Sequence, residues 1–235
     1  MPNKFHVLKN KKIFIVDTET TGLPIRKPKI YTPAQYYNYK DYEKYDPSRM
    51  VQLSWTIMHV IDNSKTDIIK DYMIKPSGFI IPDSKFHNVT HKIAMEKGFE
   101  LSQLVLILLQ DLNSVDFIIG HNIWFDINII MSELSRLVTS NKIEPELLQH
   151  TKNCMKTIYK LAKNNKIVCS GVFSKNILKL KSHHPKYFKM PKLIELYKYY
   201  YGEEFENQHD SKYDVLALLK CIVKTCNLQN YIIKL

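Results

Sequence analysis

The sequence lacks the features of membrane-spanning and cross-linked proteins. Its longest apolar run, 104–109, is far too short to cross a bilayer. The four cysteines form no C-x-x-C pair and no zinc-like cluster with histidines. No signal peptide precedes them, so we expect reduced cysteines in a soluble, intracellular protein without a membrane partner. The cysteines are Cys154, Cys169, Cys221 and Cys226.

Arginine is also scarce, because Arg26, Arg49 and Arg136 are the only arginines and lysines supply the remaining positive charge. The formal net charge is nevertheless +11. Such an excess favours a polyanionic partner, nucleic acid first and an anionic membrane surface second, although a merely lysine-rich surface has the same charge. Lysine suits contact with backbone phosphates, but an AT-rich genome would produce the same bias. The arginine content therefore says little about base specificity.

The distribution of apolar residues predicts an α/β fold. The chain has 235 residues, 45% of them hydrophobic, which suits a single domain over 1–235. We predict strands at 12–16, 50–61, 67–74 and 116–119, and helices at 101–112, 126–137, 144–162, after Pro191, and at 210–225. A short connection between the second and third strands favours antiparallel pairing. The order of elements predicts a mixed sheet with helices on its faces.

Residues 24–49 differ from the rest of the chain in composition. They contain four prolines and six tyrosines: Pro24, Pro28, Pro33, Pro47, Tyr31, Tyr36, Tyr37, Tyr39, Tyr42 and Tyr45. We interpret this Tyr/Lys/Pro-rich stretch as an extended loop inserted between the first two strands. Its tyrosines and lysines could stack on bases and contact phosphates. A structural flap that covers the sheet edge is an equal alternative.

The first acidic pair ends an apolar strand. In Ile13 to Pro24 (IFIVDTETTGLP), Asp17 and Glu19 are two residues apart, so a strand places both carboxylates on one face. Two like charges at close range are unfavourable unless a cation lies between them. Asp41 and Glu43 have the same spacing, but they lie in the tyrosine loop, where we expect solvated charge.

Two further segments carry candidate site residues. In FIIGHNIWFD, Gly120 supplies a turn and Asp126 begins the next helix, either facing the end of the sheet or acting only as a helix N-cap. In QHDSKYDV, His209 precedes a helix whose first turns contain Asp214. Residues five apart do not share a helix face, so the histidine must approach from the loop.

Together these residues indicate a site for two divalent cations. Four carboxylates, Asp17, Glu19, Asp126 and Asp214, suit Mg²⁺, which prefers carboxylates and water. Two such ions orient a water and stabilise the entering and leaving oxygens of a phosphodiester. A histidine beside them, here His209, is suited to take a proton from that water.

The three segments resemble the motifs of the DEDDh family of 3′→5′ exonucleases, the DnaQ-like proofreaders and RNase T relatives. IVDTETTGLP resembles the first motif, GHNIWFDI the second and HDSKYDV the third. The tyrosine subclass would require a tyrosine at position 210, which is Asp210, so the histidine subclass is implied. Ser211 departs from the family's usual alanine, and we expect this change to be harmless. The resemblance covers nearly the whole chain except the tyrosine loop.

The resemblance implies an RNase H-like fold with a five-stranded, mostly parallel sheet that has one antiparallel strand. It implies two Mg²⁺ or Mn²⁺ ions, release of nucleoside 5′-monophosphates, and a role in DNA repair or RNA processing. It assigns Asp17, Glu19, Asp126 and Asp214 to the metals and His209 to general base catalysis. Thr20, Leu23 and Phe125 would bind the terminal nucleotide, although a core position for Phe125 is equally consistent with the sequence.

Two alternatives remain beside a 3′→5′ exonuclease acting on single-stranded 3′ ends. A non-catalytic nucleic-acid-binding module could keep the fold, but it predicts loss of a carboxylate or of the histidine, and all five are present. An RNase H-like endonuclease has less support, because the histidine motif favours the exonuclease. The sequence does not distinguish DNA from RNA, and it is silent on oligomeric state and on a polymerase or other repair partner.

Overall fold

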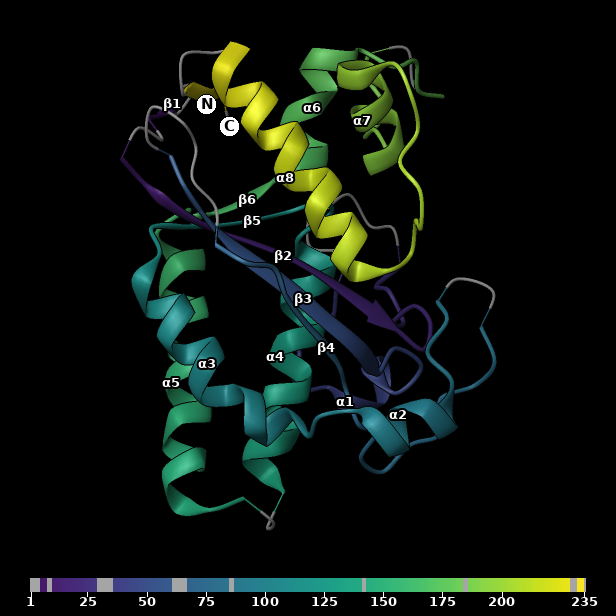
Figure 1. The fold of residues 1–235 in the computed structure, drawn as a ribbon, viewed down its shortest axis with the longest axis vertical. Helices are drawn as coiled ribbons and strands as arrows, with labels where there is room; N and C mark the ends of the chain where they lie inside the picture. The colour runs from purple at the N-terminus through teal and green to yellow at the C-terminus, as the bar shows by residue number, and fades with distance from the viewer. Residues whose placement is uncertain are drawn as a thin grey trace.

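A mixed five-stranded sheet organises the chain, with strand order β4-β3-β2-β5-β6. The computed structural model describes residues 5–7, 10–28, 36–60, 67–84, 87–140, 143–183, 186–228 and 232–234 (Figure 1). The strands are β2 Lys12–Thr20, β3 Met50–His59, β4 Lys70–Met73, β5 Phe117–Gly120 and β6 Ile167–Cys169. Only β3 runs against the others, since β2 pairs antiparallel with β3 and parallel with β5. The predicted sheet is confirmed.

Helices cover both faces of this sheet (Figure 1). They are α1 Tyr42–Tyr45, α2 His91–Lys97, α3 Leu101–Ser114, α4 Trp124–Thr139, α5 Pro145–Lys163, α6 Ser170–Leu178, α7 Leu193–Tyr201 and α8 Ser211–Leu228. A separate antiparallel pair joins β1 Phe5–Val7 to β7 Ile232–Lys234, near the two ends of the chain. Among the described helices, none combines the length and apolarity needed to cross a membrane.

The alternation of β2 divides the core into two layers. Phe14 and Val16 pack into the cluster that contains residues of α3, α4 and α5. Ile13 and Ile15 belong to the opposite cluster, which contains Val215 and other α8 residues. Because alternate residues share a face, Asp17 and Glu19 lie on the α8 side of the sheet.

Two of the predicted boundaries are corrected by the structure. The first strand does not end at Val16, because β3 pairs with β2 as far as Thr20. The segment after α5, left unassigned from the sequence, supplies the fifth strand β6, which pairs with β5, and then helix α6. Asp17 and Glu19 therefore lie inside the strand, which continues past both of them to Thr20.

The tyrosine-rich insertion is a loop over most of its described residues, with short regular pieces inside it. It contains α1, and an antiparallel bridge joins Arg26 to Tyr36. Tyr45 is 1% exposed, and its hydroxyl donates to the Tyr37 carbonyl over 2.7 Å. Burial of this phenol shows that part of the insertion is core. Tyr31 lies outside the described residues.

Candidate metal centre

The first two carboxylates, Asp17 and Glu19, lie on the part of the central strand β2 that follows its pairing with β5. β5 pairs with β2 only from Ile13 to Ile15, and it ends at Gly120. On the other side β2 stays paired with β3, Asp17 opposite Ser54 and Glu19 opposite Gln52. This arrangement holds the two carboxylates on rigid backbone while leaving space beside them for residues from other segments.

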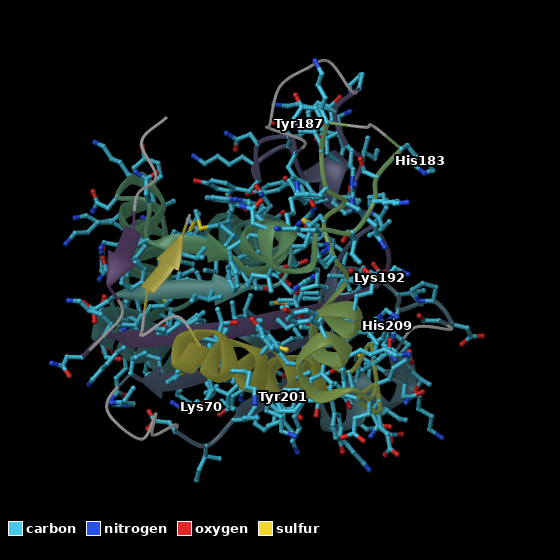
Figure 2. All side chains as sticks on the ribbon, turned by 90° about the horizontal axis from the view of Figure 1, so that it is seen from above. Lys70, His183, Tyr187, Lys192, Tyr201 and His209 are labelled. Carbon is cyan, nitrogen blue, oxygen red and sulfur yellow. The ribbon has the colours of Figure 1, made fainter. Side chains whose placement is uncertain are left out.

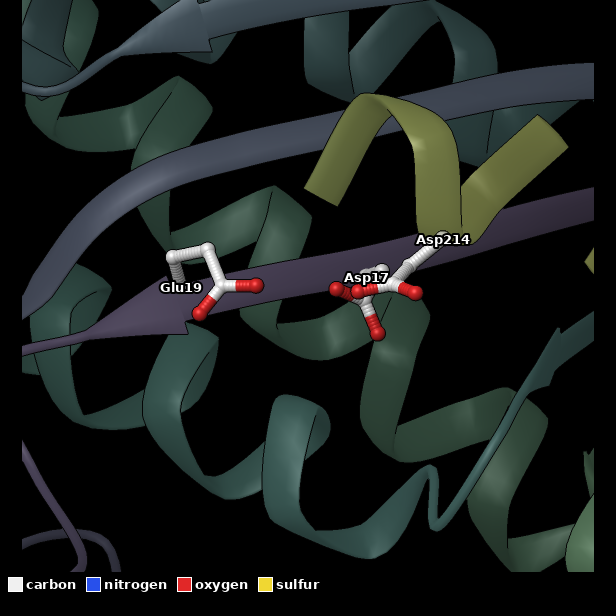
Figure 3. Close-up of side chains that lie close together, drawn as sticks. All are labelled: Asp17, Glu19 and Asp214. Carbon is white, nitrogen blue, oxygen red and sulfur yellow. The ribbon is translucent and has the colours of Figure 1, made fainter. Parts of the chain in front are cut away.

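Three carboxylates converge at this end of the sheet. Asp17, Glu19 and Asp214 each offer an oxygen, and these oxygens lie within 4.8 Å of one another. Asp214 comes from the first turn of α8, which crosses the face to which Asp17 and Glu19 point. Figure 3 shows the carboxylates of Asp17 and Asp214 close together, with Glu19 further along the strand. An all-oxygen set of this kind suits Mg²⁺ or Mn²⁺.

Asp126 lies beside this group but is held by a different contact. It is 2% exposed, and its Oδ1 accepts hydrogen bonds from the Thr18 backbone N–H at 3.0 Å and from the Thr18 hydroxyl at 2.8 Å. Because β5 has already ended, the carboxylate replaces a strand carbonyl as the partner of this N–H. Among the described residues, Asp126 is not in the group of three oxygens. The N-cap position of α4 is Ile123, so the simple N-cap interpretation of Asp126 was wrong.

Burial and mutual repulsion raise the pKa values of all four carboxyl groups. Burial is the main cause for Asp17, whose pKa is raised well above its ordinary value, with further effects from Asp126, Asp214, Glu19 and Asp210. Burial, followed by the charges of Asp214, Asp126 and Asp210, raises the pKa of Glu19 to about 8. Such a site favours protons or cations over bare carboxylates.

The other two carboxyl groups follow the same pattern. Burial raises the pKa of Asp126 to about 7, against the opposing hydrogen bonds from Thr18. Burial likewise raises the pKa of Asp214 to about 7, against a hydrogen bond from the His209 backbone. The effect of Asp126 on Asp17 and Glu19 shows that it belongs to the same electrostatic group.

His209 lies on the loop before α8, as expected. Its φ of 66° places the backbone in the left-handed region, and its backbone N–H donates to Asp214 Oδ2 over 3.2 Å. Its side chain is exposed, and Figure 2 shows it at the periphery of the molecule. The main chain of His209 thus ties the loop to the first turn of α8.

A polar network that the sequence analysis missed joins β3 and β4 to this loop and to the start of α8. The Gln52 amide donates to Asp71 Oδ1 at 2.9 Å and to Asp210 Oδ1 at 3.0 Å. Ser54 donates to Asp71 Oδ1 at 2.7 Å and shares a 2.6 Å hydrogen bond with Ser211. The serine in place of the family's alanine is therefore a buried link between β3 and α8. The sequence does contain a sign of this network, because Gln52, Ser54 and Thr56 are polar residues at alternate positions of the otherwise apolar strand β3.

The three residues expected to bind the terminal nucleotide differ in exposure. Leu23 is 66% exposed and thus accessible to a ligand. Thr20 donates its hydroxyl to the Gly22 carbonyl over 2.7 Å. Phe125 is half-buried and packs against the core cluster on the α4 side, which agrees with the core alternative. A contact with a nucleotide stays a prediction for all three.

Solved structures of similar architecture include three exonucleases. A 3′-exonuclease described for 3′-end-specific recognition of histone mRNA stem-loop matches 92% of this chain and 63% of its own, with a TM-score of 0.57 and 9% identity. A full-length 3′-exonuclease matches 98% of this chain and 63% of its own, with a TM-score of 0.59 and 8% identity. Exonuclease I from Methylocaldum szegediense matches 94% and 41%, with a TM-score of 0.58 and 15% identity.

Sequence comparison adds no relative to these structures. No family model and no curated protein matches the chain. The chain also spans less than two thirds of the length of each structure above. At such low identity the likeness concerns the fold, and it agrees with the strand order and pairing of the sheet. The chain therefore has the predicted RNase H-like fold, which it shares with solved 3′-exonucleases.

Proposed function

We propose that this chain is a metal-dependent 3′→5′ exonuclease that releases nucleoside 5′-monophosphates from single-stranded nucleic acid. The observation that carries the proposal is the convergence of Asp17, Glu19 and Asp214 within 4.8 Å, in a fold shared with 3′-exonucleases. The net charge of +11 fits a polyanionic substrate.

The four carboxylates are the proposed ligands of two divalent cations, Mg²⁺ or Mn²⁺. Asp17, Glu19 and Asp214 supply oxygens directly, and Thr18 fixes Asp126 beside them. Two cations bound there would stabilise charge on the entering and leaving oxygens of the phosphodiester and would orient the attacking water. The raised pKa values support this assignment, because a cation would offset both the cost of burying the charged carboxylates and the repulsion between them.

His209 is the proposed general base. A neutral imidazole has a nitrogen lone pair, so His209 can accept the proton that the attacking water loses. Its backbone contact to Asp214 ties the loop to the carboxylate group, while its exposed side chain lies where solvent and substrate have access. The Gln52–Asp210 hydrogen bond fixes the residue that follows His209.

The choice between DNA and RNA is tested together with the activity. One similar structure is described with histone mRNA, and the other two are described only as exonucleases. The experiment is a time course on 5′-labelled single-stranded DNA and RNA of matched sequence, with Mg²⁺, Mn²⁺ or EDTA. We expect a ladder that shortens from the 3′ end, requires the metal and is absent for Asp17→Ala. The faster polymer identifies the substrate class.

The chain contains a matched control for this variant. Asp41 and Glu43 have the same spacing as Asp17 and Glu19 but lie at α1, outside the carboxylate group. Asp41→Ala should keep the activity that Asp17→Ala loses. Absence of products with both polymers, or equal activity of the two variants, would contradict the proposal. Metal-independent binding of nucleic acid without hydrolysis would then favour a non-catalytic binding module.

A further inference from the structure

A large cavity lies between the insertion and helices α4, α5 and α6. Its volume is about 1110 Å³, somewhat more than the roughly 300–1,000 Å³ typical of pockets for a small ligand. Aromatic and cationic side chains line much of it: Arg26, Tyr36, Tyr39, Trp124, Tyr159 and Lys175. Trp124 is 44% exposed and Tyr159 is 64% exposed, so both rings are accessible. The size and the rings suit an extended ligand with flat groups.

The first turn of α4 joins this cavity to the carboxylate group. Trp124, Ile127 and Asn128 line the cavity and follow the spacing of a single helix stripe. Asp126 lies between them in sequence and is turned toward Thr18. One helical turn of α4 therefore carries both a cavity residue, Trp124, and the carboxylate Asp126.

Residues of the insertion also line this cavity. Tyr36 lines the cavity together with Asn122, which lies just before α4. Burial is the main cause that raises the pKa of Tyr36, Arg26 and Asn122 oppose it, and the Asp126 carboxylate raises it further. The Tyr36 phenol therefore lies within the field of a proposed metal ligand.

Arg26 is fixed in the same wall of the cavity. A β-bridge joins it to Tyr36, and its guanidinium carbon lies 5.8 Å from the centre of the Tyr36 ring. Leu23, exposed and expected to contact the terminal nucleotide, precedes Arg26 by three residues. The chain thus runs from the expected terminal-nucleotide pocket to the cavity within one short segment.

The charge of the cavity matches a nucleic-acid strand. Arg26 and Lys175 supply positive charge, and no Asp or Glu is among the described residues that line it. Accessible aromatic rings combined with cations are the means by which proteins bind single strands, since bases stack on the rings and phosphates contact the cations. A duplex offers no unstacked bases to such rings.

We propose that this cavity binds the nucleotides immediately 5′ of the terminal nucleotide in a single-stranded substrate. The inference rests on the proposed exonuclease function, which fixes the terminal nucleotide at the carboxylates. It assigns a substrate role to Arg26 and Tyr36 of the insertion, while Tyr45 serves the core.

Binding is tested without hydrolysis in the Asp17→Ala protein with EDTA. The chain has two tryptophans; Trp55 is 0% exposed, so Trp124 is the one whose fluorescence a ligand can quench by contact. Octathymidylate and octauridylate should quench it, with thymidine 5′-monophosphate binding far more weakly. Adding Tyr159→Ala should weaken octamer binding by about 5- to 100-fold, the range of base–aromatic stacking. Adding Lys175→Ala, which removes a cation that contacts phosphates, should also weaken octamer binding and make it less dependent on salt. Tyr199→Ala, which removes a 56% exposed tyrosine on α7, should leave it unchanged.

Hydrolysis supplies an independent readout in the otherwise unmodified chain with Mg²⁺. The p-nitrophenyl ester of thymidine 5′-monophosphate has a terminal nucleotide and none on its 5′ side. Tyr159→Ala should raise KM for octathymidylate about 5- to 100-fold and leave turnover of the ester unchanged. Equal effects on both substrates, no effect on either, or tight binding of the mononucleotide would overturn the cavity proposal. Loss of hydrolysis with every substrate, with octamer binding and its Tyr159 dependence retained, would instead contradict the exonuclease function.

Discussion

At the scale of single residues, a substitution at His209 distinguishes a catalytic role of this side chain from a role in binding metal. Its backbone N–H contacts Asp214, and its φ of 66° is a conformation that asparagine tolerates better than alanine. His209→Asn therefore keeps the backbone contact while it removes the imidazole. If the imidazole is the general base, we expect the hydrolysis rate to fall by about 10²–10⁴. Single-turnover assays at saturating Mg²⁺ measure this change.

Metal binding by the same variant is the control. Mg²⁺ should raise the melting temperature of His209→Asn as much as that of the parent, because the ligands in the proposal are carboxylates alone. Loss of this stabilisation would identify His209 as a metal ligand. Asp214→Asn, which changes one of the three converging carboxylates, should by contrast lose much of the stabilisation.

At the scale of elements, the turn between β5 and α4 positions Asp126. A Cβ on Gly120 would meet the Cδ1 of Ile123 and lie 3.1 Å from the Val16 carbonyl oxygen. Gly120→Ala should therefore lower the free energy of unfolding by about 1–3 kcal/mol, the usual cost of overpacking. It should also lower activity, because α4 carries Asp126 into its contact with Thr18.

A second substitution tests the cause of this loss. Ile123→Val removes the Cδ1 and alone should cost about 0.5–1.5 kcal/mol, since Ile123 is 0% exposed. In the double variant part of the Gly120→Ala loss should return, because the main clash is gone. Denaturant titrations of the four proteins give the coupling energy. Additive costs would show that the clash with Ile123 does not govern the turn.

The same elements show how far the sequence predicts this structure. The long β-branched and aromatic runs of β2 and β3 identified both strands, and the two-residue period correctly placed Asp17 and Glu19 on one face. β6 has only three residues, which is too few to show a hydrophobic period in the sequence. It is a strand because its residues pair with Ile118 and the neighbouring residues of β5. The hydrogen bond between Gln52 and Asp210 joins residues 158 positions apart, a proximity that local pattern does not contain.

At the scale of the whole molecule, the carboxylate group should link stability to pH and to metal. Ordinary carboxyl groups titrate near about 4, whereas burial and repulsion raise the pKa to about 8 for Glu19 and to about 7 for Asp126 and Asp214. Between pH of about 4 and about 8, these carboxyl groups therefore keep protons in the folded protein that they have lost in the unfolded chain. The contribution of this group to stability therefore falls as pH rises from about 4 to about 8 in metal-free protein.

A cation reverses this dependence, because it binds the deprotonated carboxylates and must displace protons at low pH. Mg²⁺ should raise the melting temperature more at pH 8 than at pH 5. In EDTA at pH 8, the melting temperature of Asp17→Asn should exceed that of the parent by about 2–4 °C for each kcal/mol of repulsion relieved. This difference in melting temperature should become smaller at pH 5. Asp41→Asn, outside the group, should show no such trend. A destabilised Asp17→Asn at pH 8 in EDTA would mean that this carboxylate is not held against its neighbours' charge, and the case for a metal centre would lose its electrostatic basis.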